Sequence, residues 1–242
     1  MEGLKVKEKE IVVPGDIIAE GMGFLPSKHV YREENKLIAS RTGVIEIEGN
    51  VIKLMPLSGI YLPKFGDTII AEVGDILMSG WRLETYSPYS AVLSLKEATS
   101  AYIPKGADLT KYFAIGEHVS TKVVNVTSQN LVDVTMNAPG LRKLRDGRII
   151  RVNPYKVPRI IGKNGSMISM VKDFTNCRIV VGQNGVIWIE GEPKQELVAV
   201  KAIEYIEREA HTSGLTDRVK LLLEEGMPAQ KNDKVAKAPK LR

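Results

Sequence analysis

Short runs of alternating apolar and polar residues fill the first 140 positions of the chain, with Gly, Pro or Asn between them. Such runs, interrupted roughly every 8–12 residues, are typical of small β barrels and sandwiches. Residues 44–48 and 51–54 flank Gly49-Asn50, and a Gly-Asn pair supplies the positive φ of a tight hairpin turn. We therefore predict that this part is β-rich, because no amphipathic helix competes with the pattern.

A glycine followed by an acidic residue opens three of these strands, at Gly15-Asp16, Gly66-Asp67 and Gly116-Glu117. Small β barrels often start strands with such a turn. Alternatively, each turn opens a separate β unit, which would make residues 63–66 a domain boundary. Two intervals are too few to indicate a repeat array. We place an N-terminal β domain at residues 1–63.

The pattern changes after residue 147. We predict a strand at 148–152, helices at 154–161 and 167–174, strands at 177–181 and 186–190, and a helix at 194–210. Ser166 is a good N-cap for the second helix, and Asn184-Gly185 is a strong hairpin turn. The order is β-α-α-β-β-α, over a domain at 147–212. A short helix at 216–225 follows, and the Ala-, Lys- and Pro-rich residues after it predict a disordered basic tail within 213–242.

The positive charge of the chain is concentrated in one short segment. The formal net charge is +5 and the sequence pI is about 9.1. Eight basic residues and one acidic residue lie within 140–163, which we call the basic segment, whereas residues 1–139 hold 14 basic and 17 acidic residues. Positive charge packed in this way favours an anionic partner. A solvated linker between two domains is the alternative explanation.

The single cysteine, Cys177, cannot form a disulfide within the chain, which fits a reducing cytoplasm. The charged N-terminus does not resemble a signal peptide, and no apolar run reaches the ~18 residues that a membrane span needs. We expect a cytoplasmic location and no membrane partner.

Residues 157–168 contain a G-x-x-G sequence at 162–165, preceded by an apolar pair and followed by Ile168. Within the β-α-α-β-β-α order, this resembles the signature of a type I KH domain. Two glycines let the backbone approach a sugar-phosphate chain closely, and the following helix directs free N–H groups at phosphate. The resemblance implies RNA contacts by a loop and its surroundings: Arg159, Ile160, Ile161, Gly162, Lys163, Asn164, Gly165, Ser166 and Ile168.

Each of these assignments has a structural alternative. The isoleucines could be core residues, and we expect some to lie in the core and some in an apolar groove for unpaired bases. Arg159 could be a solvated surface charge, and Asn164 could serve the turn alone. The preceding part of the basic segment would guide RNA to the loop through Arg142, Lys143, Arg145 and Arg148.

Residues 64–143 contain Trp81, Tyr86, Tyr89 and Tyr102 among only 14 aromatic residues in the chain. The strands predicted at 68–73, 90–95, 116–126 and 131–136 are similar to those of an S1-type OB barrel. Such barrels bind single strands by stacking bases on exposed aromatic rings. We therefore name Trp81, Tyr86 and Tyr89 as candidate base-stacking residues, with burial in the barrel core as the alternative.

An N-terminal β domain, an S1-type OB barrel and one KH domain together resemble the S1/KH cap subunits of the archaeal RNA exosome, of the ribosomal RNA-processing protein 4 type. Residues 13–16, Val-Pro-Gly-Asp, look like that family's N-terminal signature. The resemblance implies a multidomain, mainly β fold with one α+β domain. It also implies single-stranded RNA as ligand, and three copies seated through their N-terminal domains on a hexameric phosphorolytic nuclease ring.

An enzymatic role is not expected. His29, His118 and His211 lack ligand spacing, and no nucleotide-binding or metal motif is present. Asp16, Asp67 and Asp75 lie in turn contexts rather than in the carboxylate cluster that a two-metal nuclease needs. We predict no catalytic residue, no metal and no cofactor. The competing hypothesis is a free-standing S1–KH protein that regulates transcription or translation.

Overall fold

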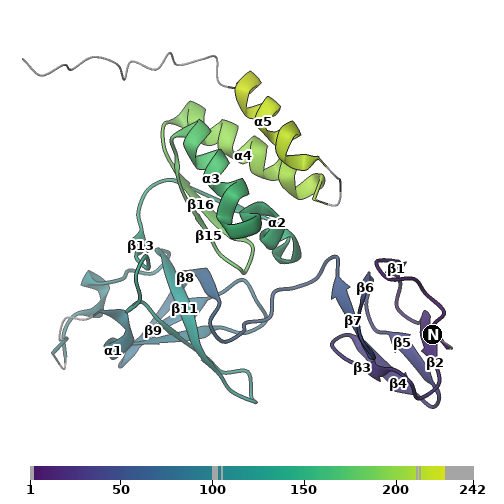
Figure 1. Cartoon of the computed structure of the whole chain (residues 1–242). Helices are drawn as coiled ribbons and strands as arrows, with labels where there is room; N and C mark the ends of the chain where they lie inside the picture. The colour runs from purple at the N-terminus through teal and green to yellow at the C-terminus, as the bar shows by residue number, and fades with distance from the viewer. Residues whose placement is uncertain (1–2, 100–102, 105, 211, 213, 227–242) are drawn as a thin grey trace, which may run out of the picture.

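The computed structural model of the chain describes residues 3–99, 103–104, 106–210, 212 and 214–226. A small β domain, a β barrel and an α+β domain follow one another along the sequence (Figure 1). The predicted fold class is confirmed, whereas the predicted boundaries at residues 63, 143 and 212 stay predictions. Tyr102, His211 and the tail predicted to be disordered lie outside the described residues. Within the described ranges, no helix is both long and apolar enough to cross a bilayer.

Seven strands in two sheets form the N-terminal domain. They are β1 (Ile11–Val12), β2 (Ile17–Glu20), β3 (Leu25–Pro26), β4 (Val30–Glu33), β5 (Lys36–Ala39), β6 (Gly43–Glu48) and β7 (Val51–Pro56). One sheet has the order β1-β6-β7-β3 and the other β2-β5-β4. The predicted hairpin is β6–β7, in which Glu48 pairs with Val51 across the Gly-Asn turn. Apolar residues from both sheets, among them Ile18, Leu37 and Ile45, form one fully buried core.

The barrel is a closed five-stranded sheet. Its strands are β8 (Thr68–Leu77), β9 (Gly80–Glu84), β10 (Ala91–Ser94), β11 (His118–Val126) and β12 (Val132–Thr135). All neighbouring pairs are antiparallel except β10–β12, and β11 closes the circle by pairing with both β8 and β12. This is the topology of an OB fold. Helix α1 (Leu95–Ala98), the 3-10 turn η1 (Leu109–Lys111) and strand β13 (Lys143–Leu144) complete it.

The two Gly-acid turns of the barrel lie at opposite ends of the antiparallel pair β8–β11. The Gly66 N–H donates to the Val123 carbonyl at 2.9 Å, and the Gly116 N–H donates to the Val73 carbonyl at 2.8 Å. Both glycines have positive φ, which such a turn requires. The idea that each turn opens a separate β unit is therefore wrong for the third turn, because it belongs to the same barrel as the second.

The C-terminal domain has the predicted β-α-α-β-β-α order. Its elements are β14 (Arg148–Arg151), the 3-10 turn η2 (Pro154–Lys156), α2 (Val157–Ile161), the 3-10 turn η3 (Lys163–Gly165), α3 (Ser166–Thr175), β15 (Arg178–Val181), β16 (Val186–Glu190), α4 (Pro193–Arg208) and α5 (Leu215–Gly226). The sheet order is β14-β16-β15, fully antiparallel, with helices on one face (Figure 1). Ser166 lies inside α3 rather than at its N-cap, because left-handed Gly165 takes that position.

The other face of this sheet packs on the barrel. Four consecutive residues of β16, from Val186 to Ile189, are at most 2% exposed. Ile187 and Ile189 belong to the core under the helices, whereas Val186 and Trp188 pack against Ile70 of β8. Strand β16 is therefore covered on both faces, and so is β8 at Ile70. The barrel and the KH-type domain share a buried apolar contact.

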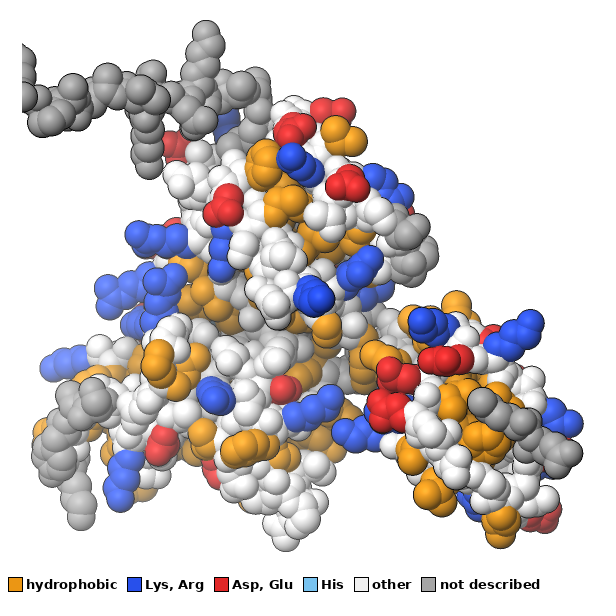
Figure 2. All heavy atoms as spheres, in the orientation of Figure 1, with side chains coloured by type: hydrophobic (Ala, Val, Ile, Leu, Met, Phe, Trp, Pro, Cys, Tyr) orange, Lys and Arg blue, Asp and Glu red, His pale blue; other side chains and the backbone are white. Residues whose placement is uncertain are grey.

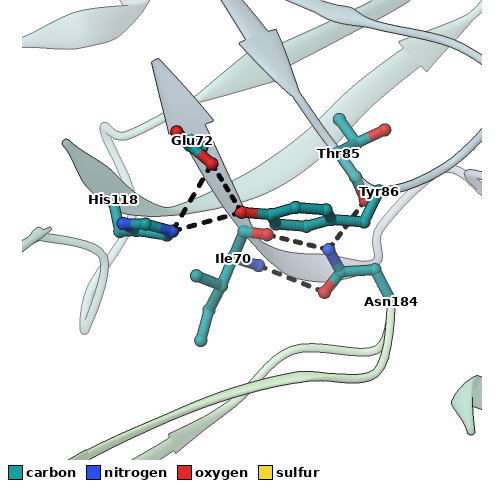
Figure 3. Close-up of polar contacts among 6 residues, drawn as sticks. All are labelled: Ile70, Glu72, Thr85, Tyr86, His118 and Asn184. Atoms are coloured by element: carbon teal, nitrogen blue, oxygen red, sulfur yellow. Dashed lines mark hydrogen bonds and ion pairs between the residues drawn. The ribbon is translucent and has the colours of Figure 1, made fainter. Parts of the chain in front are cut away.

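Asn184, which is 3% exposed at the turn between β15 and β16, adds polar specificity to this contact (Figure 3). Its amide group donates to the carbonyls of Ile70 at 2.8 Å and Thr85 at 2.9 Å. Its side-chain oxygen accepts from the Ile70 N–H at 3.3 Å. Nearby, the Gln183 side chain accepts from the Thr68 N–H at 2.6 Å. The hairpin predicted from Asn184-Gly185 thus also fixes the position of the KH-type domain relative to the barrel.

The Asn184→Ala variant should lower the free energy of unfolding by about 3 kcal/mol, because buried backbone groups of Ile70 and Thr85 lose their partner. The measurement is urea unfolding followed by tryptophan fluorescence, which reports on Trp188 in this contact and on Trp81 in the barrel core. The matched control is Asn125→Ala, which removes one exposed side-chain bond to Asp133 and should cost about 0.5 kcal/mol. Equal losses for the two variants would contradict a structural role for Asn184.

Candidate nucleic-acid interface

The G-x-x-G loop is a tight turn between α2 and α3. Gly162, Asn164 and Gly165 all have positive φ, at 76°, 53° and 78°. A Cβ on Gly162 would lie 2.7 Å from the Met167 Cβ, whereas a Cβ on Gly165 would meet nothing within 4 Å. Gly162 is therefore required by the fold. Gly165 leaves open space at the loop surface, where a ligand backbone could approach.

Side chains on and beside the loop face solvent. Lys163, Asn164 and Ser166 are exposed. In the described part of the chain, no acidic side chain forms an ion pair with Lys163. Arg159 is also exposed, and its guanidinium donates to the Thr212 carbonyl at 3.2 Å. Directly after the loop, the Ser166 N–H donates to the Lys163 carbonyl, and the next N–H groups of the first turn of α3 have no acceptor within that helix. The loop is thus electropositive and accessible.

The three candidate isoleucines divide between core and surface. Ile160 is fully buried and Ile168 is 7% exposed, both within the core under α3 and α4. The prediction that these two contact RNA is therefore wrong, because side chains closed off in the core cannot reach a ligand. Ile161 is only partly buried and lines a cavity beside α2. Among the three, it alone can meet a ligand directly.

The basic segment does not form one free surface. Lys143 pairs with Glu117, and its ammonium lies 5.8 Å from the centre of the Phe113 ring. The Arg148 guanidinium lies 3.7 Å from the Glu196 carboxylate. Lys143 is thus committed to barrel contacts, because it is partly buried as well as paired.

Two further arginines of the segment, Arg142 and Arg145, are exposed. The Arg142 guanidinium stacks at 5.2 Å from the centre of the Trp188 ring. Lys and Arg side chains gather over the side of the molecule where β13 leads into the KH-type sheet (Figure 2). Arg142 and Arg145 therefore offer positive charge at the junction between the barrel and the KH-type domain, and exposed Arg148 adds a charge that Glu196 partly neutralises.

Trp81 is not an exposed stacking platform. It is fully buried in the barrel, its ring packs edge-on against Phe113 at 5.1 Å, and its indole N–H donates to the Phe113 carbonyl at 3.2 Å. The prediction that Trp81 stacks on bases is wrong, because an aromatic ring is the largest filler for a small barrel core. Tyr89 is partly buried and packs against the same core.

Tyr86 is tied into the contact between the barrel and the KH-type domain (Figure 3). Its hydroxyl donates to the Glu72 carboxylate at 2.7 Å and lies 3.2 Å from the His118 ring. Burial and the bond to Glu72 raise the pKa of Tyr86, so the hydroxyl stays protonated. The Arg151 guanidinium stacks 3.9 Å from the ring centre. A base could stack on that ring face only by displacing Arg151.

The described residues offer little for thiol or metal chemistry. Burial raises the pKa of Cys177, which is 5% exposed and packs in the core as predicted. Among the residues that the structure describes, no three His, Cys, Asp or Glu side chains are placed to hold a metal ion.

Sequence reasoning missed a cavity between the N-terminal domain and the KH-type domain. Its volume is about 660 Å³, and Lys28, Lys64, Tyr155 and Ile161 are among its lining residues. These residues come from three separate segments of the chain. No local motif connects them, so only the packing of the domains brings them together.

Comparison with known proteins gives a consistent result. The family model described as the exosome RNA binding protein RRP4 N-terminal domain matches residues 9–58, and a KH domain model matches residues 147–195. The exosome complex component Rrp4 of Methanothermobacter thermautotrophicus is 44% identical over 221 residues, which is 91% of this chain and 70% of that protein. The Rrp4 of Methanothermus fervidus is 43% identical over 218 residues, 90% of this chain and 96% of that protein.

A solved structure described as an exosome complex RNA-binding protein has the same fold over most of its length. It superimposes with a TM-score of 0.63 at 34% sequence identity and covers 69% of this chain and 97% of that one.

The two loop glycines should differ in their effect on stability. Gly162→Ala should cost about 3 kcal/mol, because the new Cβ collides with Met167 and positive φ is strained. Gly165→Ala should cost only about 1 kcal/mol, because it meets open space and carries the φ strain alone. Urea unfolding of both variants checks this, and an equal or reversed order would contradict the assignment of Gly162 to the fold.

Proposed function

Because the chain belongs to the family of archaeal exosome components named Rrp4, we propose that it binds single-stranded RNA as a non-catalytic cap subunit. Three copies would sit on a hexameric phosphorolytic ring and guide the 3′ end of RNA into it. The observation that carries this proposal is the exposed G-x-x-G loop, within a chain that matches Rrp4 relatives over nine-tenths of its length.

The loop would hold the RNA backbone. Phosphate can approach Gly165 because no Cβ blocks the space, while Lys163 supplies a mobile positive charge and the first turn of α3 supplies N–H donors. Bases of the same strand would lie against Ile161 beside the loop. The exposed cations at the barrel junction, Arg142, Arg145 and Arg148, would attract the strand from solution.

The N-terminal domain is suited to a protein partner. Ten of the 17 exposed large apolar side chains in the described part of the chain lie between residues 11 and 65. A large contiguous apolar patch marks an interaction surface, and the proposal takes these side chains to contribute to one. Ile11 on β1 and Leu25 on β3 lie on the two edge strands of one sheet. This supports docking of the domain on the ring.

Catalysis would belong to the ring and not to this chain, which we place in the cytoplasm. The proposal needs no cofactor. It differs from that of a free-standing regulator of transcription or translation in one measurable respect, stable assembly with the ring.

Gly165→Asp should weaken binding of a 12-nucleotide poly(A) strand about tenfold, because a carboxylate would occupy the phosphate position. The matched control is Gly165→Asn, which has the same shape, tolerates the left-handed backbone and carries no charge. Fluorescence anisotropy at low salt measures both affinities. Unchanged affinity of the folded Asp variant would show that the loop is not the phosphate site.

Mixed with the six-subunit ring, the chain should form a complex of three copies per ring, measured by light scattering after size exclusion. Replacing Ile11 and Leu25 by Asp should abolish the complex, because two charges would enter the apolar contact. Leu221→Asp is the matched control, since Leu221 on α5 is as exposed as Leu25, at 58%. Absence of any stable complex would leave the free-standing regulator as the better explanation.

A further inference from the structure

The cavity beside α2 has three walls from different parts of the chain. The N-terminal domain contributes Lys28 and Met55, the linker after β7 contributes Leu62 and Lys64, and the KH-type domain contributes Tyr155 and Ile161 among others. In Figure 1, the linker that leaves β7 passes below α2. A volume of about 660 Å³ lies within the usual range of small-ligand sites, and would admit one or two nucleotides.

Positive charge surrounds this cavity. Three lysines and His29 line it, against one carboxylate, Asp67. Lys53 is paired with Glu48 at 2.5 Å, whereas Lys28 and Lys64 are exposed and form no ion pair among the described residues. The pKa of His29 is lowered by burial and by the nearby charges of Arg41, Lys28 and Lys64. Unneutralised cations thus converge on the cavity mouth.

Two of the polar side chains that line the cavity are hydrogen-bonded to each other. The Tyr61 hydroxyl donates to the Asp67 carboxylate at 2.7 Å, and burial together with that bond raises the pKa of Tyr61, so it stays a donor. The Asp67 carboxylate therefore already accepts one hydrogen bond from within the protein. The remaining walls are largely apolar, with Tyr155, Pro158 and Ile161 on the side of α2. A lining that combines apolar and aromatic side chains with two unpaired lysines suits a heterocyclic base that carries a phosphate.

The cavity also adjoins the proposed RNA-binding loop, because Ile161 lines it and is followed directly by Gly162. We propose that this cavity binds a nucleotide of the single-stranded RNA held at the G-x-x-G loop, with its base against Tyr155 and Ile161 and its phosphate on Lys28 and Lys64. The N-terminal domain is then part of the RNA-binding surface as well as a docking domain. This inference rests on the proposed function and adds a second subsite to it.

The first test replaces Lys28 and Lys64 by Glu and measures binding of fluorescein-labelled 12-nucleotide poly(A) to the full chain by anisotropy. We expect at least about a tenfold loss of affinity, and a salt dependence whose slope falls by about 0.7, the value for one single-strand phosphate contact. The matched control replaces Lys7 and Lys36 by Glu, because both are exposed in the same domain, away from the cavity. Equal loss in the control pair would overturn the proposal.

A charge-neutral variant separates the cavity from general electrostatics. Met55→Trp fills part of the cavity from the N-terminal side and should weaken RNA binding severalfold, whereas Met22→Trp, on an exposed residue elsewhere in the domain, should not. Crosslinking with RNA that contains 4-thiouridine should mark peptides that include Tyr155 or Leu62. Crosslinks confined to the loop peptide would overturn the proposal.

Gly165→Asp, measured alongside, distinguishes the two proposals. If it weakens binding while the Lys28/Lys64 variant matches its control, the cavity proposal fails and the loop proposal stands. If the Lys28/Lys64 variant weakens binding and Gly165→Asp does not, the cavity proposal stands and the loop proposal fails. Competition with ADP tests a free nucleotide as the occupant, and an ADP affinity above that of the RNA strand would overturn the assignment to RNA. If the Lys28/Lys64 variant lost binding to the ring but kept its affinity for RNA, the cavity would be a protein contact instead.

Discussion

The contact between β8 and β16 determines how the functional parts of the chain are placed. The Ile70 side chain, on the outside of the barrel, packs against Val186 and Trp188. Asn184 forms hydrogen bonds with the backbone N–H and carbonyl of Ile70 at the edge of that contact. A buried polar side chain with three hydrogen bonds across the contact fixes one relative position, since any displacement leaves unpaired groups in an apolar setting. The barrel therefore cannot turn independently of the KH-type domain, and the loop keeps a fixed direction relative to the barrel.

Local residue patterns in the sequence were sufficient to predict the helices and strands. The Gly-Asn and Asn-Gly turns determine the hairpins β6–β7 and β15–β16, because Gly49 and Gly185 take the positive φ that each turn contains. The packing of domains was harder to predict, although the sequence carries a signal. Residues 69–71 and 186–189 are continuous apolar runs where a sheet with one solvent face would alternate, and the structure covers both faces at those points.

The candidate site was predictable only where a motif is contiguous. The glycine loop could be located because its residues are neighbours in sequence, yet the pattern could not tell Gly162, which packs on Met167, from Gly165, which faces open space. Clustering of aromatic residues gave no information on their direction, so buried Trp81 was mistaken for a surface ring. Lys28, Lys64 and Tyr155 lie too far apart in sequence for any local pattern to join them.

The two junctions of the KH-type domain differ in character, and this difference bears on ligand binding. Its junction with the barrel is an apolar cluster, whereas its junction with the N-terminal domain includes one hydrogen bond, from the Asn153 amide to the Leu57 carbonyl at 3.2 Å, and the approach of Tyr155 to Gly59. A junction with few buried apolar contacts opens at low free-energy cost. A nucleotide bridging Lys28 and Tyr155 would stabilise the closed arrangement by mass action. RNA binding and the placement of the N-terminal domain would then be thermodynamically linked, because each favours the same closed junction.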